Sequence, residues 1–274
     1  MSDREEYVAE VEQNWSSLRM GCVREAVIKG SAAIFLVAGS GGIAAVTRGA
    51  NSQIPYAGAS NVQNTATLTE YHSAFEMTGF NVFATQGNQK RVMQMSSIAV
   101  MNRNIDGVIL TALSSATNTA AGTTGSTASL ALVAKAKAAL GMGQVDTTEA
   151  DNMFAVVSPG FMAYLAQTTE FANSLYVDVK TFAGPTRRML RWYGVNWIES
   201  PLISALGTTA ELCYMWHRNG LGHAANVENM DVLVGYDEKQ DSSWSRASLF
   251  HGAVLMQQAA VVQIVHDGSA FTAT

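Results

Sequence analysis

The sequence predicts an α+β fold laid out along one long helix. Three observations support this prediction. Residues 89–116 repeat apolar side chains at helical spacing, and residues 51–86 alternate polar and apolar side chains as strands do. After residue 130 the chain mixes short strand and helix patterns without a regular β–α–β order, as α+β domains do.

The long helix is the most extended element that the sequence predicts. Between residues 89 and 113 there is no proline, and the only glycine is Gly107. A helix of this length spans roughly 40 Å at about 1.5 Å per residue. It fits either the core helix of an α/β domain or a girder that carries a flat, elongated subunit. Its apolar face consists of Val92, Met95, Ile98, Ala99, Ile105, Val108, Ile109, Ala112 and Leu113.

The N-terminal residues 2–19 predict a short amphipathic helix. Ser2 or Asp3 is a suitable cap, and the apolar stripe contains Val8, Val11, Trp15 and Leu18. A terminal helix this short needs another surface to be stable. That surface belongs either to the same subunit or to a neighbour, and the sequence leaves both open.

A glycine-rich segment follows an apolar, strand-like run at residues 32–38. Gly39, Gly41 and Ala44 match the G-x-G-x-x-A fingerprint of dinucleotide-binding folds. The required context is missing, because Gly49, Asn51 and Pro55 interrupt the helix that should follow. A glycine-rich bend is the favoured interpretation, and a nucleotide-dependent oxidoreductase is the weaker alternative.

Residues 51–86 are polar and predict a long hairpin. Thr65, Thr67 and Thr69 alternate with other residues, and Phe75 and Met77 begin a second alternating run. A hairpin without a core of its own is marginal in water, so it must lie on another surface.

The remaining elements follow a low-complexity connection at residues 114–129. A helix over residues 130–140 ends at Gly141, and Pro159 starts another. Residues 251–266 fit either a helix or a strand. The predicted strands cover residues 153–157, 189–198, 212–217 and 230–236.

The composition favours a subunit of an oligomer. The chain has 274 residues, of which 48% are hydrophobic and only 14% are charged, against about 25% charged in a typical soluble domain. Neutral surface of this extent often becomes buried between subunits. The net charge of −5 argues against a dedicated nucleic-acid binder.

Cys22 and Cys213 fit a reducing compartment and provide neither a disulfide framework nor a zinc pattern. The acidic N-terminus does not resemble a signal peptide. We therefore expect a soluble protein that is made and used inside a cell.

No catalytic, cofactor or metal site is predicted. Ser158 lies in VVSPG rather than in G-x-S-x-G, and the chain has no phosphate-binding P-loop motif. The closest histidines, His217 and His223, lack the spacing of a helical ligand pair. We therefore do not expect an enzyme.

One basic cluster is present, at Arg187, Arg188 and Arg191, beside Trp192 and other aromatic residues. Basic and aromatic residues together are typical of a nucleic-acid platform. They are equally enriched at protein interfaces, and the acidic total charge favours that interpretation.

Four blocks of the sequence resemble the major capsid proteins of tailed bacteriophages, which have the Hong Kong 97-type fold. The blocks are DNMFAVVSPGFMAYLAQTTEF, RWYGVNWIESP, ELCYMWHRNGLGHA and SLFHGAVLMQQAAVVQI. The order of the predicted elements also resembles that family over nearly the whole chain.

The resemblance implies a division of the chain into five parts. These are an N-terminal arm (1–50), an extended β-hairpin loop (51–87), a spine helix of a peripheral domain (88–117), an axial α+β domain (118–236) and a return to the peripheral domain (237–274). The extended loop would lie across a neighbouring subunit. The candidate inter-subunit contacts are Trp15, Leu18, Thr69, Tyr71, Phe75, Arg187, Arg188, Arg191 and Trp192.

The implied function is that of a coat protein. Copies would assemble in the host cytoplasm into pentamers and hexamers of an icosahedral head, which encloses double-stranded DNA without sequence specificity. The implied partners are further copies of the chain, a separate scaffolding protein and a portal protein. An encapsulin-like bacterial compartment shell, which resembles the same fold, is the alternative.

Some members of this fold class join subunits by an isopeptide bond from a loop lysine. The lysines of this chain are at positions 29, 90, 135, 137, 180 and 239, so none lies between Asn51 and Gln89. The resemblance therefore implies a shell that non-covalent contacts hold together.

Overall fold

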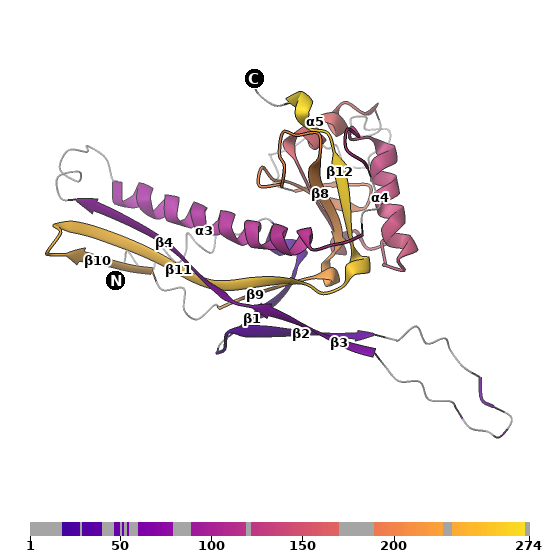
Figure 1. Cartoon of the computed structure of the whole chain (residues 1–274), viewed down its shortest axis with the longest axis horizontal. Coiled ribbons are helices and arrows are strands. Elements are labelled where there is room, and N and C mark those ends of the chain that lie inside the picture. The colour runs from indigo at the N-terminus through magenta and orange to yellow at the C-terminus, as the bar shows by residue number, and fades with distance from the viewer. Residues whose placement is uncertain are drawn as a thin grey trace.

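The structure is a computed structural model that describes residues 18–27, 29–39, 47–49, 51, 54, 60–78, 89–118, 122–169, 189–226 and 232–271. Three parts are visible in Figure 1: a long helix lying along a sheet, a second body at one end of that helix, and a hairpin that projects away from both. The predicted α+β class is confirmed.

The long helix α3 (Gln89–Ser114) confirms the central prediction. Its residues Ile98, Ile105, Ile109 and Leu113 are buried, as their spacing predicts. Figure 1 shows the helix along β4 (Thr69–Thr78) and β11 (Ser242–Leu255). The girder interpretation therefore fits this helix.

The sheet beneath α3 is built around β11, which has 14 residues. β11 pairs antiparallel with β4 on one side. On the other side it pairs first with β10 (Val232–Asp237) and then with β9 (Leu221–Ala225). β1 (Val23–Ala26) adds in parallel to β9. Strands distant in sequence thus form one sheet, which the local pattern could not reveal.

The second body contains a five-stranded sheet in the order β12-β8-β5-β7-β6. α4 (Leu130–Met142) lies beside it, and α5 (Pro159–Ala166) follows β5 directly. Its strands are β5 (Met153–Val157), β6 (Met189–Trp192), β7 (Val195–Glu199), β8 (Glu211–His217) and β12 (Val261–His266).

Local chemistry explains how these helices begin. The Ser129 side chain accepts a hydrogen bond from Leu132 N–H, and Ser158 accepts one from Phe161 N–H, as N-caps do. Pro159 occupies the tolerated first turn of α5, as predicted. α4 ends at Gly143 rather than at the predicted Gly141, because the helix continues for two more residues.

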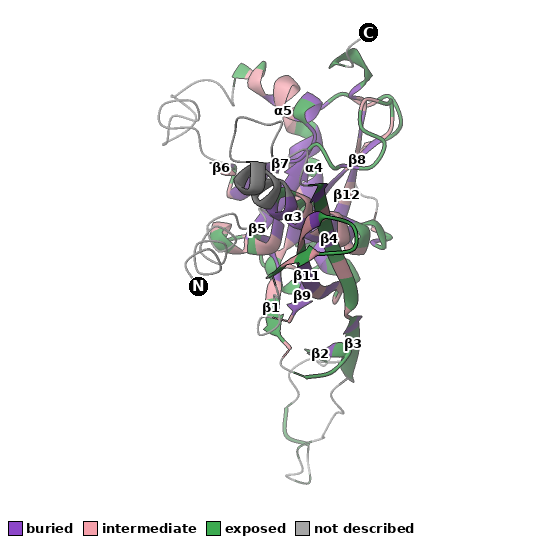
Figure 2. Cartoon of the chain, turned by 90° about the vertical axis from the view of Figure 1, so that its left-hand side faces the viewer, coloured by how far each residue is buried: buried purple, intermediate pink, exposed green. Residues whose placement is uncertain are grey.

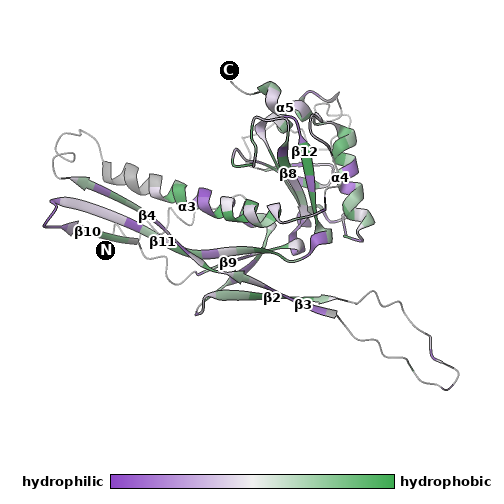
Figure 3. Cartoon of the chain, in the orientation of Figure 1, coloured by the Kyte–Doolittle hydropathy of each residue, from purple (hydrophilic) through white to green (hydrophobic). Residues whose placement is uncertain are grey.

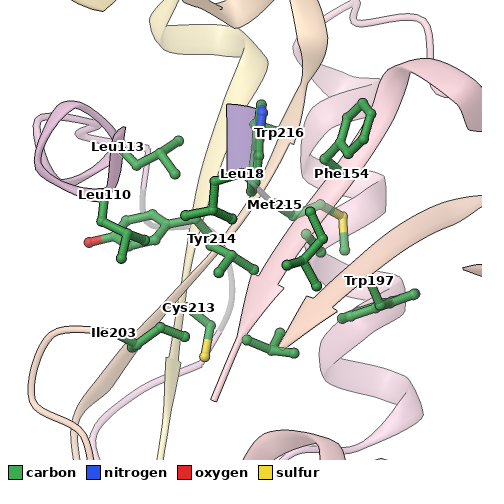
Figure 4. Packing of buried hydrophobic residues seen from close by; sticks show 14 of the residues in the cluster. Leu18, Leu110, Leu113, Phe154, Trp197, Ile203, Cys213, Tyr214, Met215 and Trp216 are labelled. Atoms are coloured by element: carbon green, nitrogen blue, oxygen red, sulfur yellow. The ribbon is translucent and has the colours of Figure 1, made fainter. Parts of the chain in front are cut away.

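One hydrophobic core joins the two sheets. Leu110 and Leu113 of α3 belong to the same buried cluster as Leu18 and Tyr214, and Figure 4 shows them together. The Trp216 indole donates a hydrogen bond to the Gly21 carbonyl at 2.7 Å. The chain segment around residues 18–22 is therefore fixed between the helix and the second body.

The prediction that two strands within residues 51–86 pair with each other as a hairpin is wrong. β3 (Ser60–Thr67) pairs antiparallel with β2 (Ala32–Gly39), and Thr69–Thr78 pairs with β11. Alternation identifies strands but does not specify which strands pair. The projecting hairpin is thus β2–β3, and residues 40–59 connect its two strands in the sequence.

Two further predictions need correction, and one open alternative is decided. Residues 189–198 form two strands, because Tyr193 and Gly194 turn the chain with φ values of 54° and 70°. For residues 251–266 the sequence left helix and strand open, and the structure has the end of one strand, a short 3-10 turn and a second strand. β12 pairs with β8, whereas β9 and β10 pair with β11, so the sheets divide the chain differently from the predicted ranges 118–236 and 237–274.

Candidate assembly surfaces

The β2–β3 hairpin buries one face against its own subunit. Ala33, Phe35 and Ala66 are buried near its base. Phe35 lies against Gly222 of β9, where an added Cβ would meet the Phe35 ring at 2.9 Å. The Asn64 side chain donates a hydrogen bond to the Met256 carbonyl at 3.2 Å. These contacts fix the base of the hairpin on the sheet that contains β9 and β11.

On the other face of the hairpin, the residues that β2 contributes are apolar and exposed. Ile34 is 54% exposed and Leu36 is 76% exposed. Figure 2 shows the hairpin as mostly exposed, and Figure 3 shows apolar residues along β2. A two-stranded ribbon of this kind is marginal alone and is a site for association with another surface. It is the clearest candidate assembly surface in the described part of the chain.

A second apolar surface lies on β10. Val234 and Tyr236 are more than half exposed, and Leu233 is less so. Among the described strands β10 pairs only with β11, so no described strand pairs with its other edge. Neither this surface nor the face of β2 was recognised from the sequence, although the exposed Leu36 belongs to the apolar run at residues 32–38.

The predicted contacts on residues 69–75 lie in β4, within the sheet below α3. Thr69 is exposed, whereas Tyr71 and Phe75 are half-buried. The Tyr71 ring lies 4.8 Å from the His251 ring, so much of it serves its own subunit. Thr69 keeps a surface that a neighbour could contact.

Leu18 is fully buried in its own core, and its N–H donates to Asp106 at 3.4 Å. Its side chain therefore has no surface left for a neighbour, and the prediction of an inter-subunit contact does not fit this position. Trp15 lies outside the described residues.

Of the predicted basic cluster, the structure describes Arg191 and Trp192. Arg191 forms an exposed ion pair with Asp151 at 3.0 Å. Trp192 is 6% exposed, so its ring contributes mainly to the core. Arg187 and Arg188 lie outside the described residues.

The turn after Trp192 exposes Tyr193, which was not among the predicted inter-subunit contacts. Tyr193 is 47% exposed and has a positive φ, which is uncommon for a non-glycine residue. Lys137 Nζ donates to the Tyr193 carbonyl at 2.8 Å and lies 4.7 Å from the centre of its ring. The dipeptide Tyr-Gly between two strand patterns was the available sequence signal for this turn.

Ser158, Glu211 and His266 meet inside the second body. The Ser158 hydroxyl donates to Glu211 Oε2 at 2.5 Å, and Gly207 N–H donates to Oε1 at 2.6 Å. His266 Nε2 lies 3.9 Å from Glu211 Oε2. In a hydrolytic triad the histidine stands between the serine and the acid. Here the carboxylate stands between them, so the arrangement supports the fold rather than activating a nucleophile.

A second buried pair consists of His223 and His251, whose rings are 5.5 Å apart. Both are fully buried. Burial, with repulsion from Arg19 and His251, lowers the pKa of His223 to about 3. Burial and Arg19 lower the pKa of His251 to about 4. His251 Nε2 lies 2.8 Å from Asn104 Oδ1 of α3, so the pair connects the helix with β9 and β11.

The described residues hold no group of three side chains arranged to bind a metal ion. Among the helices that the structure describes, none is both long and apolar enough to cross a membrane. The predicted glycine fingerprint also lacks its context, because β2 pairs antiparallel with β3 in a two-stranded sheet. Gly41 and Ala44 lie outside the described residues.

The fold is similar to those of phage capsids. The capsid of Ralstonia phage GP4 matches with a TM-score of 0.72 at 9% identity, over 95% of this chain and 93% of that chain. A chain of Mycobacterium phage Che8 matches with a TM-score of 0.66 at 15% identity, over 86% and 85%. The holo-SrpI encapsulin complex from Synechococcus elongatus gives 0.59 at 12% identity, over 92% and 88%.

The long helix, the projecting hairpin and these similarities define a Hong Kong 97-type fold. The family described as phage capsid protein matches residues 5–268. The chain therefore belongs to the phage capsid protein family, whose members are structural proteins. No curated protein sequence matches it significantly.

Proposed function

We propose that this chain is the major subunit of an icosahedral phage head, and that its copies form hexameric and pentameric rings around double-stranded DNA. The observation that carries the proposal is the apolar outward face of β2, where Ile34 and Leu36 are exposed, on a hairpin whose described residues contact the rest of the subunit through Phe35 and Asn64. In a ring, each subunit offers one patch and receives a different one, so a projecting element requires a complementary surface on its neighbour.

The sheet pairings support a revised assignment of the chain segments to the two domains. We propose that α3 and the sheet around β11 form the peripheral domain and that the sheet from β12 to β6 forms the axial domain. The extended loop is then the β2–β3 hairpin, which starts at Ala32 and ends at Thr67. This hairpin lies across the neighbouring subunit.

The other partners follow from the same function. A separate scaffolding protein guides assembly in the host cytoplasm, a portal protein occupies one vertex, and the DNA contacts the inner surface without sequence specificity. The chain performs this role without catalysis, and its location is the virion capsid.

An encapsulin-like compartment is the second candidate, and its basis is the similarity to the encapsulin complex. The gene neighbourhood separates the two functions. Terminase and portal genes beside this gene accompany a phage head, whereas a gene for a cargo enzyme accompanies a compartment.

Assembly tests the proposal directly. We expect the chain, expressed alone or with its scaffolding protein, to form closed shells or rings in electron micrographs. Shells purified from the source should protect double-stranded DNA from nuclease. A monodisperse monomer that persists under assembly conditions with the scaffold present would contradict the proposal.

A further inference from the structure

Among the described residues of the second body, the aromatic residues Tyr193 and Phe271 are 47% and 46% exposed. Each connects to the interior through a ring contact. The Tyr193 ring lies 5.8 Å from Trp192, and the Phe271 ring lies 4.8 Å edge-on from Tyr164 of α5. Exposed aromatic residues that rest on a packed interior are typical centres of protein interfaces.

The two residues lie at opposite corners of the five-stranded sheet. Tyr193 joins β6 and β7 at one edge, and Phe271 follows β12 at the other edge. β5 is parallel to β7 and antiparallel to β8, and β8 is antiparallel to β12. β7 and β12 therefore run in the same direction. Tyr193 precedes β7 and Phe271 follows β12, so the residues also lie at opposite ends of the strands.

Both corners hold their aromatic residue in place. At the first corner, Lys137 holds the Tyr193 carbonyl and lies over its ring. At the second corner, Asp267 accepts a hydrogen bond from Ser269 N–H at 3.0 Å, and Phe271 N–H donates to the Gly268 carbonyl at 3.1 Å. Residues that are already fixed lose little conformational entropy on binding.

The corners also carry opposite charges. Lys137 brings a cation to Tyr193, while the nearby Arg191 is paired with Asp151. Asp267 brings an anion to Phe271, and hydrogen bonds from Ser269 lower the pKa of this carboxyl. A ring of identical subunits needs two patches that are different and complementary.

We propose that the corner of Tyr193 and Lys137 on one copy docks against the corner of Phe271 and Asp267 on the next copy around the ring. This inference rests on the proposed ring assembly and names the surfaces that form it. The contact is heterologous, so each copy uses both corners, once toward each neighbour.

Disulfide cross-linking tests the contact. In assembled shells of the Y193C/F271C double variant, oxidation should give covalent multimers up to the size of a ring on a non-reducing gel. Each single variant should stay monomeric, and a mixture of the two single variants should stop at dimers. The natural cysteines, Cys22 and Cys213, are fully buried and do not interfere. The matched control M142C/F271C uses an exposed residue outside the proposed contact and should remain monomeric.

Charge reversal provides an independent measurement if cysteine substitution itself reduces assembly. Lys137→Glu and Asp267→Lys should each raise the subunit concentration needed for assembly at least about tenfold, because like charges then meet. The double reversal should restore assembly.

Three results would overturn the inference. The first is normal shells in micrographs without cross-linking in Y193C/F271C. The second is dimers from Y193C alone, and the third is a double reversal no better than the single ones. If the unaltered chain forms neither rings nor shells with its scaffold, the proposed function fails first, and micrographs alone reveal that failure.

Discussion

At the scale of single residues, the buried histidines His223 and His251 make stability depend on pH. Both have a pKa of about 4 or lower in the folded chain, against an ordinary value of 6.5. Below pH 6.5 the two histidines bind protons in the unfolded chain but remain neutral in the folded chain. The contribution of the two neutral histidines to the free energy of unfolding is therefore fully present above pH 6.5. It is lost as the pH falls toward 4, by up to about 1.4 kcal/mol per pH unit for each histidine.

We expect His223→Leu to flatten this dependence. The change removes one titrating group from the pair, so the loss of stability between pH 7 and pH 5 should shrink. Urea unfolding of the purified subunit at several pH values measures it. The control is His72→Leu, because that ring lies near the surface. An unchanged slope in His223→Leu would refute the assignment.

The position of the Glu211 carboxylate requires a glycine at position 268. A Cβ added to Gly268 would collide with the Glu211 carboxylate and displace it from Ser158 and Gly207. Because hydrogen bonds to a buried charge are costly to lose, Gly268→Ala should destabilise the subunit by about 3 kcal/mol.

Gly141→Ala is the matched control for Gly268→Ala. Nothing lies within 4 Å of an added Cβ at this helical glycine. The change should stabilise α4 by about 0.5–1 kcal/mol. Thermal or urea unfolding measures both variants, and an equal effect of the two changes would show that the carboxylate is not confined as described.

At the scale of elements, the two faces of the β2–β3 hairpin have separate roles. Replacing the outward residues Ile34 and Leu36 by Ser should leave the unfolding transition of the subunit nearly unchanged, because both side chains are already more than half exposed. Assembly should weaken strongly, since the apolar area that a neighbour covers is lost. Sedimentation and electron microscopy measure the two effects separately.

Phe35→Ala is the control on the inward face of the same strand. Phe35 is buried against Gly222, so its truncation should cost the subunit about 3 kcal/mol. If the outward double variant assembled normally, or lost as much subunit stability as Phe35→Ala, the hairpin would not be a surface for neighbours.

At the scale of the whole molecule, non-covalent contacts should hold the shell together. The β2–β3 hairpin extends from residue 32 to residue 67, and the sequence has no lysine in this range. The nearest lysine, Lys29, precedes β2. An amine is therefore missing where a loop cross-link would form. The durability of the shell is then kinetic, because many contacts must separate together.

Mature particles boiled in detergent and reducing agent should consequently run as one band near 29.2 kDa. Particles stored for several weeks provide the control for slow cross-linking. A ladder of multimers that survives this treatment would show that another lysine forms a covalent link.

The sequence by itself determined the class of fold and the long helix, because the spacing of residues such as Ile98, Ile105 and Ile109 is a local property. It also determined the start of α5 at Pro159. Both depend on neighbours within a few positions along the chain.

Only the tertiary structure decided which strands pair. Thr65 and Phe75 lie in adjacent strands of the sequence, yet they pair with Ile34 and Ser245, far apart in the chain. The alternation of polar and apolar residues indicates a strand with two different faces. It does not indicate which strand lies beside it. The exposure of Leu36 depends on the pairing of β2 with β3, and the burial of Leu18 depends on its packing between α3 and the second body. The candidate assembly surfaces are therefore visible only in the tertiary structure.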